Sequence, residues 1–401
     1  MRFTLSVFLL ALPLAAWAQT TLTEAEAVRL TFARSDLSDL ERGSVKIAEA
    51  DVLAAGQRPN PELSYSREHV SGSPETAEQS WMLSQSFDLS GRRGLRRDAA
   101  GRRVEVVVAE NAGRRSALAA EIRRGFHDAL LRQKNIRATE TWVQRFAKVE
   151  GMVGKLTRSG DASGYDQRRL ARERQAAEAR LASERADLGR SMARLAAFTG
   201  ANGDLAVSGE LLPPPPFPIE TALDRLAQRP DLLALSRRAE AADLDGRAAQ
   251  RGAIPDVTVG IGPKWVDNGI SRDNGVAFSL SVPLPLFDRQ QAGQQRAAAE
   301  AMQARATYRL ARAHAEGELR GLSGQAKALR VVATDYRAHA VAASPELLNI
   351  AEAAYKGGES SLLELLDAYR GALETETAAL ELERRAREAR IEYDLLTGST
   401  E

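Results

Sequence analysis

The residues able to do chemistry are scattered along this 401-residue chain instead of forming a motif. Cysteine is absent, which excludes disulfides, thiolate metal sites and thiol catalysis. The histidines have no partners at the spacing of metal ligands; they are His69, His127, His314 and His339. Residues 91–94 lack the spacing and the lysine of a phosphate-binding loop. We therefore expect no enzyme, no bound cofactor and no resident metal.

Two polar pairs have the spacing of helix caps instead. Ser361 is followed three residues later by Glu364, and Ser163 by Asp166. In a capping box the serine accepts a hydrogen bond from the third backbone N–H, and the acid binds back to the cap. Acids in a first turn also suit the helix dipole. Each pair therefore predicts the start of a helix.

Glycines stand just before both of these starts. Gly160 and Gly358, which follow helical patterns, can adopt the left-handed conformation that ends a helix. The two lie about 200 residues apart in a chain whose halves repeat one order of elements. We infer two antiparallel helical hairpins with tips at about 157–165 and 355–361.

Composition places these hairpins in an exported, helix-rich protein. Basic residues number 55 and acidic residues 54, so the charge does not indicate a nucleic-acid partner. Residues 1–18 are typical of a secretory signal, with Arg2, an apolar run and the small-residue site Ala16-Trp17-Ala18. No later apolar run is long enough to predict a transmembrane helix.

Four short segments alternate apolar with small or polar residues, which predicts strands. They cover about 61–70, 80–89, 255–263 and 276–285. Between 267 and 275, two turn dipeptides, Asn268-Gly269 and Asn274-Gly275, predict a loop. The domain boundaries that follow are a signal at 1–18, a first repeat at 19–200, a proline-rich linker at 201–218 and a second repeat at 219–401.

Four strands cannot form a closed membrane sheet within one chain. Open sheet edges are not tolerated in lipid, whereas strands of about nine residues can cross a bilayer when tilted. Three chains would supply about twelve strands, an even number typical of bacterial barrels. The predicted fold is mainly α with a membrane β-barrel, in which a duplicated helix–strand–strand–long helix–tip–helix unit builds a trimeric 12-stranded barrel and a periplasmic helical barrel.

The duplicated order resembles the TolC family of outer-membrane efflux channels. Three segments are most similar to the branch serving cobalt–zinc–cadmium pumps: Gln57–Leu63, Gln85–Arg93 and Pro283–Arg289. The resemblance covers nearly all of the chain after the signal. It implies a homotrimeric passive duct in the outer membrane of a Gram-negative cell, with a large periplasmic extension.

The same resemblance implies a gate and partners. Matching the family from Tyr355 assigns a ring of acids to Glu364 and Asp367, with capping as the alternative role of Glu364. In the first hairpin the equivalent positions are Asp166 and Arg169, either of which could pair with the second hairpin to hold a closed state.

The tips are the expected docking surface for a periplasmic adaptor (a membrane fusion protein), which would join the duct to an inner-membrane pump of the RND type. The residues concerned are Arg158, Ser159, Gly160, Lys356, Gly357 and Gly358. Glycine turn chemistry alone is the alternative explanation for these residues. The sequence does not identify the transported substrate. Heavy-metal cations are suggested only by the resemblance to the cobalt–zinc–cadmium branch, and drugs or other small molecules would also fit such a duct.

Two further alternatives remain at this point. Arginines at the start of the long first helix indicate a solvated face or contact with outer-membrane lipid headgroups; they are Arg92, Arg93, Arg96, Arg97, Arg102 and Arg103. A soluble periplasmic coiled-coil adaptor or scaffold would also explain the hairpins and the signal. It would not explain four alternating segments at matching points of two repeats.

Overall fold

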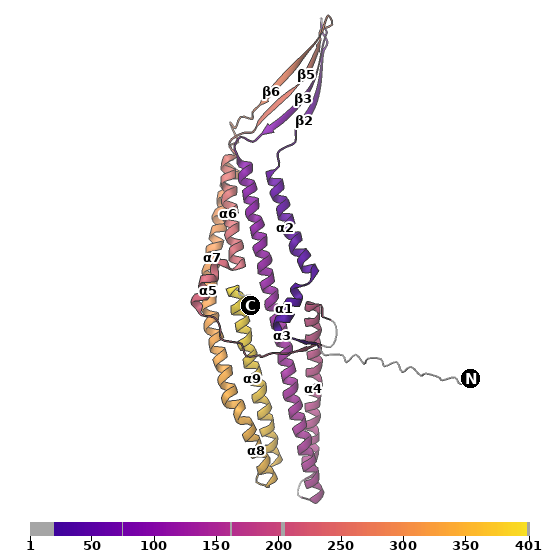
Figure 1. Cartoon of the computed structure of the whole chain (residues 1–401), viewed down its shortest axis with the longest axis vertical. Coiled ribbons are helices and arrows are strands. Elements are labelled where there is room, and N and C mark those ends of the chain that lie inside the picture. Colours follow the sequence, from indigo (N-terminus) through magenta and orange to yellow (C-terminus); the bar gives the residue numbers. More distant parts are fainter. Residues whose placement is uncertain (1–19, 74, 161–162, 202–204, 399–401) are drawn as a thin grey trace, which may run out of the picture. The chain divides into compact units, whose positions relative to one another are not determined.

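The computed structural model describes residues 20–73, 75–160, 163–201 and 205–398 (Figure 1). The predicted signal at 1–18 lies outside these residues. The chain divides into two compact units. We call residues 20–34, 120–215 and 326–391 the hairpin unit, and residues 35–119, 216–325 and 392–398 the strand unit.

The strand unit contains one four-stranded antiparallel sheet. Its strands are β2 (Glu62–Val70), β3 (Thr76–Phe87), β5 (Val257–Asp267) and β6 (Arg272–Ser281). Their order across the sheet is β2-β3-β5-β6. Two hairpins that are far apart in the sequence are thus joined through β3 and β5, with Ala77 opposite Asp267 and Phe87 opposite Val257.

The strands differ in extent from the alternating segments. β3 begins at Thr76 because its polar start still pairs with β2 and β5, and a ladder of backbone hydrogen bonds needs no apolar side chain. Only Asn268-Gly269 forms the turn between β5 and β6, where Gly269 has a φ of 79° and the Asn268 N–H donates to the Ser271 carbonyl. The loop predicted at Asn274-Gly275 is wrong, since both residues pair within β6.

Helices of the strand unit pack through small apolar patches. The helices of this unit are α2 (Ser35–Gly56), the first part of α3 (Arg92–Ser159), α5 (Ile219–Arg225), the short 3-10 helix η1 (Leu226–Gln228), α6 (Pro230–Arg251) and most of α7 (Gln291–Tyr336). Leu232, Leu319 and Tyr393 form the centre of one buried cluster. Pro230 occupies the first position of α6, where its missing N–H costs nothing.

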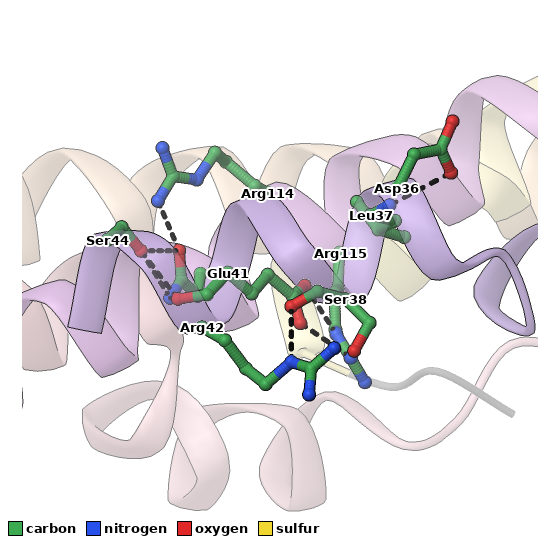
Figure 2. A network of polar contacts seen from close by, with 9 residues as sticks. Asp36, Leu37, Ser38, Glu41, Arg42, Ser44, Arg114 and Arg115 are labelled. Carbon is green, nitrogen blue, oxygen red and sulfur yellow. Dashed lines mark hydrogen bonds and ion pairs between the residues drawn. The ribbon is translucent and has the colours of Figure 1, made fainter. Parts of the chain in front are cut away.

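Polar contacts join α2 to α3 (Figure 2). The Arg115 guanidinium donates two hydrogen bonds of 2.6 Å to the Glu41 carboxylate. One turn away, the Asn111 amide donates to the Ser44 hydroxyl over 3.1 Å. The Glu41 carboxylate raises the pKa of Arg115. The forked, two-bond geometry aligns the two helices more strictly than a single ion pair would.

The hairpin unit consists of two antiparallel helix pairs and a short sheet. The later part of α3 runs beside α4 (Gly164–Thr199), with Arg185 of α4 bound to Glu140 of α3 at 2.6 Å. The second pair comprises the end of α7, the π-helix η2 (Arg337–Val341), α8 (Ala342–Lys356) and α9 (Leu362–Thr397). No helix in the described part of the chain combines the length and apolar character needed to cross a membrane.

Proline explains the break between α7 and α8. The sequence indicates a possible break at Ser344-Pro345, and the structure has a π-helical turn at 337–341 instead, with Pro345 inside α8. A proline ring clashes with the carbonyl four residues earlier, here that of Val341, and cannot donate to it. Widening the preceding turn accommodates the missing bond.

The linker region is held against α9 by arginines. The Arg387 guanidinium donates to the carbonyls of Glu210, Leu211 and Leu212 over 2.7–3.0 Å, and Arg390 donates to those of Pro214 and Pro215. Prolines leave such carbonyls without helical or sheet partners, so guanidinium donors can satisfy them.

The same region adds a strand that alternation in the sequence does not reveal. β4 (Leu205–Val207) pairs in parallel with β1 (Thr20–Leu22). Residues 202–204 of the predicted linker lie outside the described residues. Residues 205–215 of the linker are therefore part of the hairpin unit's packing.

A buried polar cluster fixes α1 (Glu24–Phe32) beside α3 and α9. The ring of His127, only 3% exposed, lies 2.8 Å from the Glu24 carboxylate through Nε2. Arg123 of α3 and Arg387 of α9 also approach this carboxylate, at 3.1 and 3.9 Å. Burial lowers the pKa of His127.

Candidate functional site

Both predicted tips lie at helix ends in the hairpin unit, and each contains one glycine with a left-handed backbone conformation. Gly160 has a φ of 89° and Gly358 a φ of 73°. Gly357 is right-handed, with a φ of −78°, so only one glycine of that pair uses its conformational freedom. Apart from the chain neighbours, no atom of the described residues lies within 4 Å of a Cβ placed at Gly160 or Gly358. Backbone conformation, and not crowding, therefore requires glycine there.

The surface beyond these glycines includes further predicted docking residues. Arg158 and Ser159 form the exposed end of α3, and Lys356 ends α8. The Ser159 hydroxyl is occupied locally, since it donates to the Leu156 carbonyl over 3.0 Å. Residues 161–162 of the first tip lie outside the described residues.

Capping chemistry accounts for Glu364 and Asp166 as predicted from their spacing. The Ser361 N–H donates to the Glu364 carboxylate over 2.9 Å, and the Glu364 N–H donates back to the Ser361 hydroxyl over 3.3 Å. Ser163 accepts from the Asp166 N–H over 3.1 Å in the same way. Each acid therefore has a sufficient structural role before any channel role is considered.

Asp367 has no such role. It is exposed one turn after Glu364 and makes no ion pair with any residue in the described ranges. Arg169 is half-buried on α4, and its Nε is shielded from solvent without a described hydrogen-bond acceptor. These two residues are the least satisfied of the four predicted gate positions.

The structure brings Asp166 close to the second hairpin, but to a tyrosine. Burial, together with the nearby Asp166 carboxylate, raises the pKa of Tyr355 at the end of α8. The two hairpins also share a buried apolar cluster, with Phe146 and Val153 of α3 packed among α9 side chains such as Leu366. The tips are therefore part of one packed body within the hairpin unit.

An ion pair that the sequence does not predict joins the hairpins about two to three helical turns after the starts of α4 and α9. Arg370 of α9 lies 2.5 Å from the Glu173 carboxylate of α4, which is only 8% exposed. The hydrogen bond from Arg370 lowers the pKa of Glu173. The signal available in the sequence was weak, because Glu173 resembles any other acid on a charged helix.

The sheet of the strand unit presents an exposed apolar face. Leu63, Leu83, Ile261 and Phe278 are directly opposite one another across the four strands, so they share one face. Each is between 48% and 77% exposed. Further exposed apolar residues on this face are Tyr65, Trp81, Phe87, Val259, Trp265, Val276 and Leu280. A contiguous apolar surface of this kind marks a site of interaction with lipid or protein.

The opposite face carries small and polar residues. Ser84, Gly260 and Ser279 form one row across three strands. A Cβ on Gly262 would lie 1.8 Å from the Trp81 carbonyl oxygen, so only glycine permits this approach of β3 and β5. Lys264 binds Glu78 at 2.5 Å on the same face.

Most of the arginines at the start of α3 are paired with acids. Arg92 lies 2.5 Å from Asp256, and Arg102 lies 3.3 Å from Glu240. Arg97 and Arg103 also have carboxylate partners. Arg93 and Arg96 have no ion pair with a described residue, so they alone remain candidates for lipid contact.

Comparison with known proteins agrees with this combination of hairpins and sheet. Residues 223–399 match the family model described as outer membrane efflux protein. The match covers the second half of the chain. The resemblance inferred from the sequence is thereby confirmed, and the protein is assigned to the outer membrane.

Two curated relatives extend the match beyond the second half of the chain. The cobalt-zinc-cadmium resistance protein CzcC of Cupriavidus metallidurans is 28% identical over 365 residues, covering 89% of this chain and 84% of the relative. The nickel-cobalt-cadmium resistance protein NccC of Alcaligenes xylosoxydans xylosoxydans is 26% identical over 270 residues, covering 63% of this chain and 59% of the relative.

Solved structures show the same fold at lower sequence identity. A crystal structure of CusC, which addresses its folding and transmembrane channel formation, has a TM-score of 0.77 at 17% identity, covering 96% of this chain and 94% of CusC. The outer membrane protein VceC from Vibrio cholerae has a TM-score of 0.75 at 20% identity, covering 94% of this chain and 97% of VceC.

Proposed function

We propose that this protein is the outer-membrane channel subunit of a tripartite efflux system and serves as a passive exit duct for heavy-metal cations. The metals in the names of both relatives, cobalt with zinc, cadmium or nickel, support cations as the cargo. Drugs or other small molecules are the competing cargo. On this proposal the chain performs no catalysis, and an inner-membrane pump supplies the energy.

The observation that carries the proposal is the exposed apolar face of an unclosed sheet. β2 and β6 each have one neighbour among the described strands, so both edges of the sheet are open within one chain. Lipid would cover the apolar face, whereas open edges would leave backbone groups unsatisfied there. Three copies joined edge to edge would form a closed barrel of about twelve strands and satisfy both requirements.

The helices extend this duct into the periplasm. On the proposed duplication, each repeat supplies one hairpin, and three chains together place six tips at the far end. Glu364 and Asp367 lie on adjacent turns of α9 and would form acidic rings around the entrance. Negative rings favour cations over anions, and their mutual repulsion has to be offset in a closed state.

Contacts between the hairpins would hold that closed state. The Asp166 carboxylate lies near enough to Tyr355 to contribute to the raised pKa of that tyrosine, and Glu173 binds Arg370. The exposed tips around Gly160 and Gly358 would receive the hairpins of a periplasmic adaptor of the membrane fusion type, which connects the duct to an RND-type pump. Opening would then move the second hairpin against the first.

The proposal is tested by location, assembly and transport. In cells carrying the cognate pump and adaptor, we expect a trimer in the outer-membrane fraction that dissociates on heating, and lower cell-associated zinc, cobalt or cadmium than in cells lacking the chain. A monomer released by osmotic shock would instead support the periplasmic scaffold. Normal metal levels combined with loss of drug export would refute metal cations as cargo while retaining the duct.

A further inference from the structure

The hairpin unit contains a cavity that the channel function does not use. Its volume is about 740 Å³, and it lies among α3, the η2–α8 segment, α9 and the linker residues 210–212. Pockets for small ligands typically measure about 300–1,000 Å³ and combine apolar walls with a few polar groups. The π-helical turn η2 forms part of the wall, and such turns occur frequently at functional sites.

Apolar side chains form much of the lining. Leu211, Leu348 and Leu373 contribute from three different segments. Trp142 joins them and contacts Phe146 edge to face, with ring centroids 4.8 Å apart. The Trp142 indole Nε1 is shielded from solvent and has no described hydrogen-bond acceptor. A buried indole N–H normally has a partner, so an acceptor is missing at this point.

The α3 wall of the cavity carries cations that have no ion-pair partner among the described residues. Lys134, Arg137 and Arg145 all line it, and none forms an ion pair with a residue in the described ranges. Among the other lining residues, Arg337 binds both Glu376 and Glu383. The remaining lining acid is Glu210, which is exposed. The α3 wall therefore offers positive charge that the cavity's own acids do not neutralise.

We propose that this cavity binds a small amphipathic anion. Its apolar body would lie against the leucines and the Trp142 ring. Its carboxylate or sulfonate head would accept hydrogen bonds from Arg137, Arg145 and the Trp142 N–H. This site is separate from the acidic entrance, where an anion would be repelled, and does not depend on the channel proposal.

The test uses 2-naphthoate as the probe, with 2-naphthalenemethanol as a neutral compound of the same size. Binding to the full chain in a non-ionic sugar detergent is measured by calorimetry and equilibrium dialysis against protein-free micelles. We expect saturable binding of one naphthoate per chain, at least about tenfold tighter than the alcohol, because hydrogen bonds to charged groups are the stronger kind. Raising the salt concentration should weaken binding of the anion and leave that of the alcohol unchanged.

Variants locate the site. The double change Arg137→Gln and Arg145→Gln should weaken naphthoate binding about tenfold or more, whereas Arg124→Gln, on an exposed arginine of α3 outside the cavity, should not change it. Trp142→Phe keeps an apolar ring but removes the donor, and should weaken binding of the anion about threefold to tenfold without affecting the alcohol. Circular dichroism and elution volume check the fold of each variant.

Several results would overturn the proposal. They are absence of saturable binding, equal affinity for the alcohol, insensitivity to salt, or an equal loss in the Arg124→Gln control. A cavity filled by a second copy or by another protein would also bind no probe and would count against it. The salt and alcohol measurements use the unmodified chain, so the conclusion stands even if a variant fails to fold.

Discussion

Loss of the Glu173–Arg370 ion pair should loosen the two hairpins. The change is Arg370→Gln, which leaves Glu173 buried without its closest cation at 2.5 Å. The matched control is Arg172→Gln, because Arg172 approaches the same carboxylate at 3.6 Å but has a side chain that is 77% exposed. Both variants remove one positive charge near the Glu173 carboxylate. A difference between their unfolding free energies therefore reports the burial and geometry of the arginine that is replaced.

The expected magnitude follows from the position of the pair. Exposed ion pairs contribute about 0.2–1 kcal/mol, and removing one member of a buried pair costs about 3–5 kcal/mol. Glu173 is buried but the side chain of Arg370 is 42% exposed, so solvent screening brings the expected cost to about 1–2 kcal/mol. That free energy changes an equilibrium by a factor of about 5–30. Arg172→Gln should cost less than about 0.5 kcal/mol.

The pH dependence provides a second test of the same pair. Arg370 holds the pKa of Glu173 below its ordinary value of 4.5 in the folded protein. The stabilisation is therefore fully present above pH 4.5 and is lost as the pH falls through the lowered pKa. We expect the difference in unfolding free energy between wild type and Arg370→Gln to shrink in that acidic range.

Two assays measure the effect. Thermal unfolding of the hairpin unit within the full chain, in a double-mutant cycle with Glu173→Gln, gives the coupling energy of the pair. Conductance of single channels in planar bilayers reports opening under the proposed function, and Arg370→Gln should increase the open fraction. Equal behaviour of Arg370→Gln and Arg172→Gln in both assays would refute the reasoning.

Three further predictions concern the tips and the buried histidine. Gly358→Val should lower the thermal midpoint, because a left-handed φ of 73° costs a residue with a Cβ roughly 1–2 kcal/mol. Gly358→Asn should lower the midpoint less. If the tip docks an adaptor, both variants should reduce metal efflux at normal trimer yield. Asp367→Ala should raise single-channel conductance with little change in stability, whereas Glu364→Ala should also lose about 1 kcal/mol of capping energy; unchanged conductance in both would remove the gate. The pKa of His127 is lowered by burial, so stability should fall as the pH drops below 6.5, where the unfolded state takes up the proton first, and His127→Gln should flatten thermal midpoints measured between pH 7 and 5.

The helical hairpins were predictable from short-range chemistry. A serine followed by an acid three residues later caps a helix through bonds within one turn, and these bonds are present at Ser163 and Ser361. The left-handed glycines at Gly160 and Gly358 have the same local origin. Leucines also recur every seven residues along α9, at Leu366, Leu373 and Leu380, and all three are buried.

Long-range pairing could not be read in the same way. The parallel pairing of β1 with β4 joins three-residue segments that carry no alternation of their own. The polar start of β3 is a strand only because β2 and β5 lie on either side of it. The hydrogen bonds from Arg387 to the linker carbonyls depend on backbone that is about 175 residues away in the chain.

The sequence by itself determined where the helices after the two tips begin, which segments alternate, and that cysteine chemistry is absent, because these properties depend on neighbours within a few residues. Tertiary structure alone decided which acids have partners. The cap at Glu364 follows from local spacing, but only the fold leaves Asp367 unpaired among the described residues and brings Glu173 to Arg370 of the other hairpin. Whether a charged side chain is buried or paired depends on how helices that are distant in the sequence pack together, and no local pattern of residues encodes that packing.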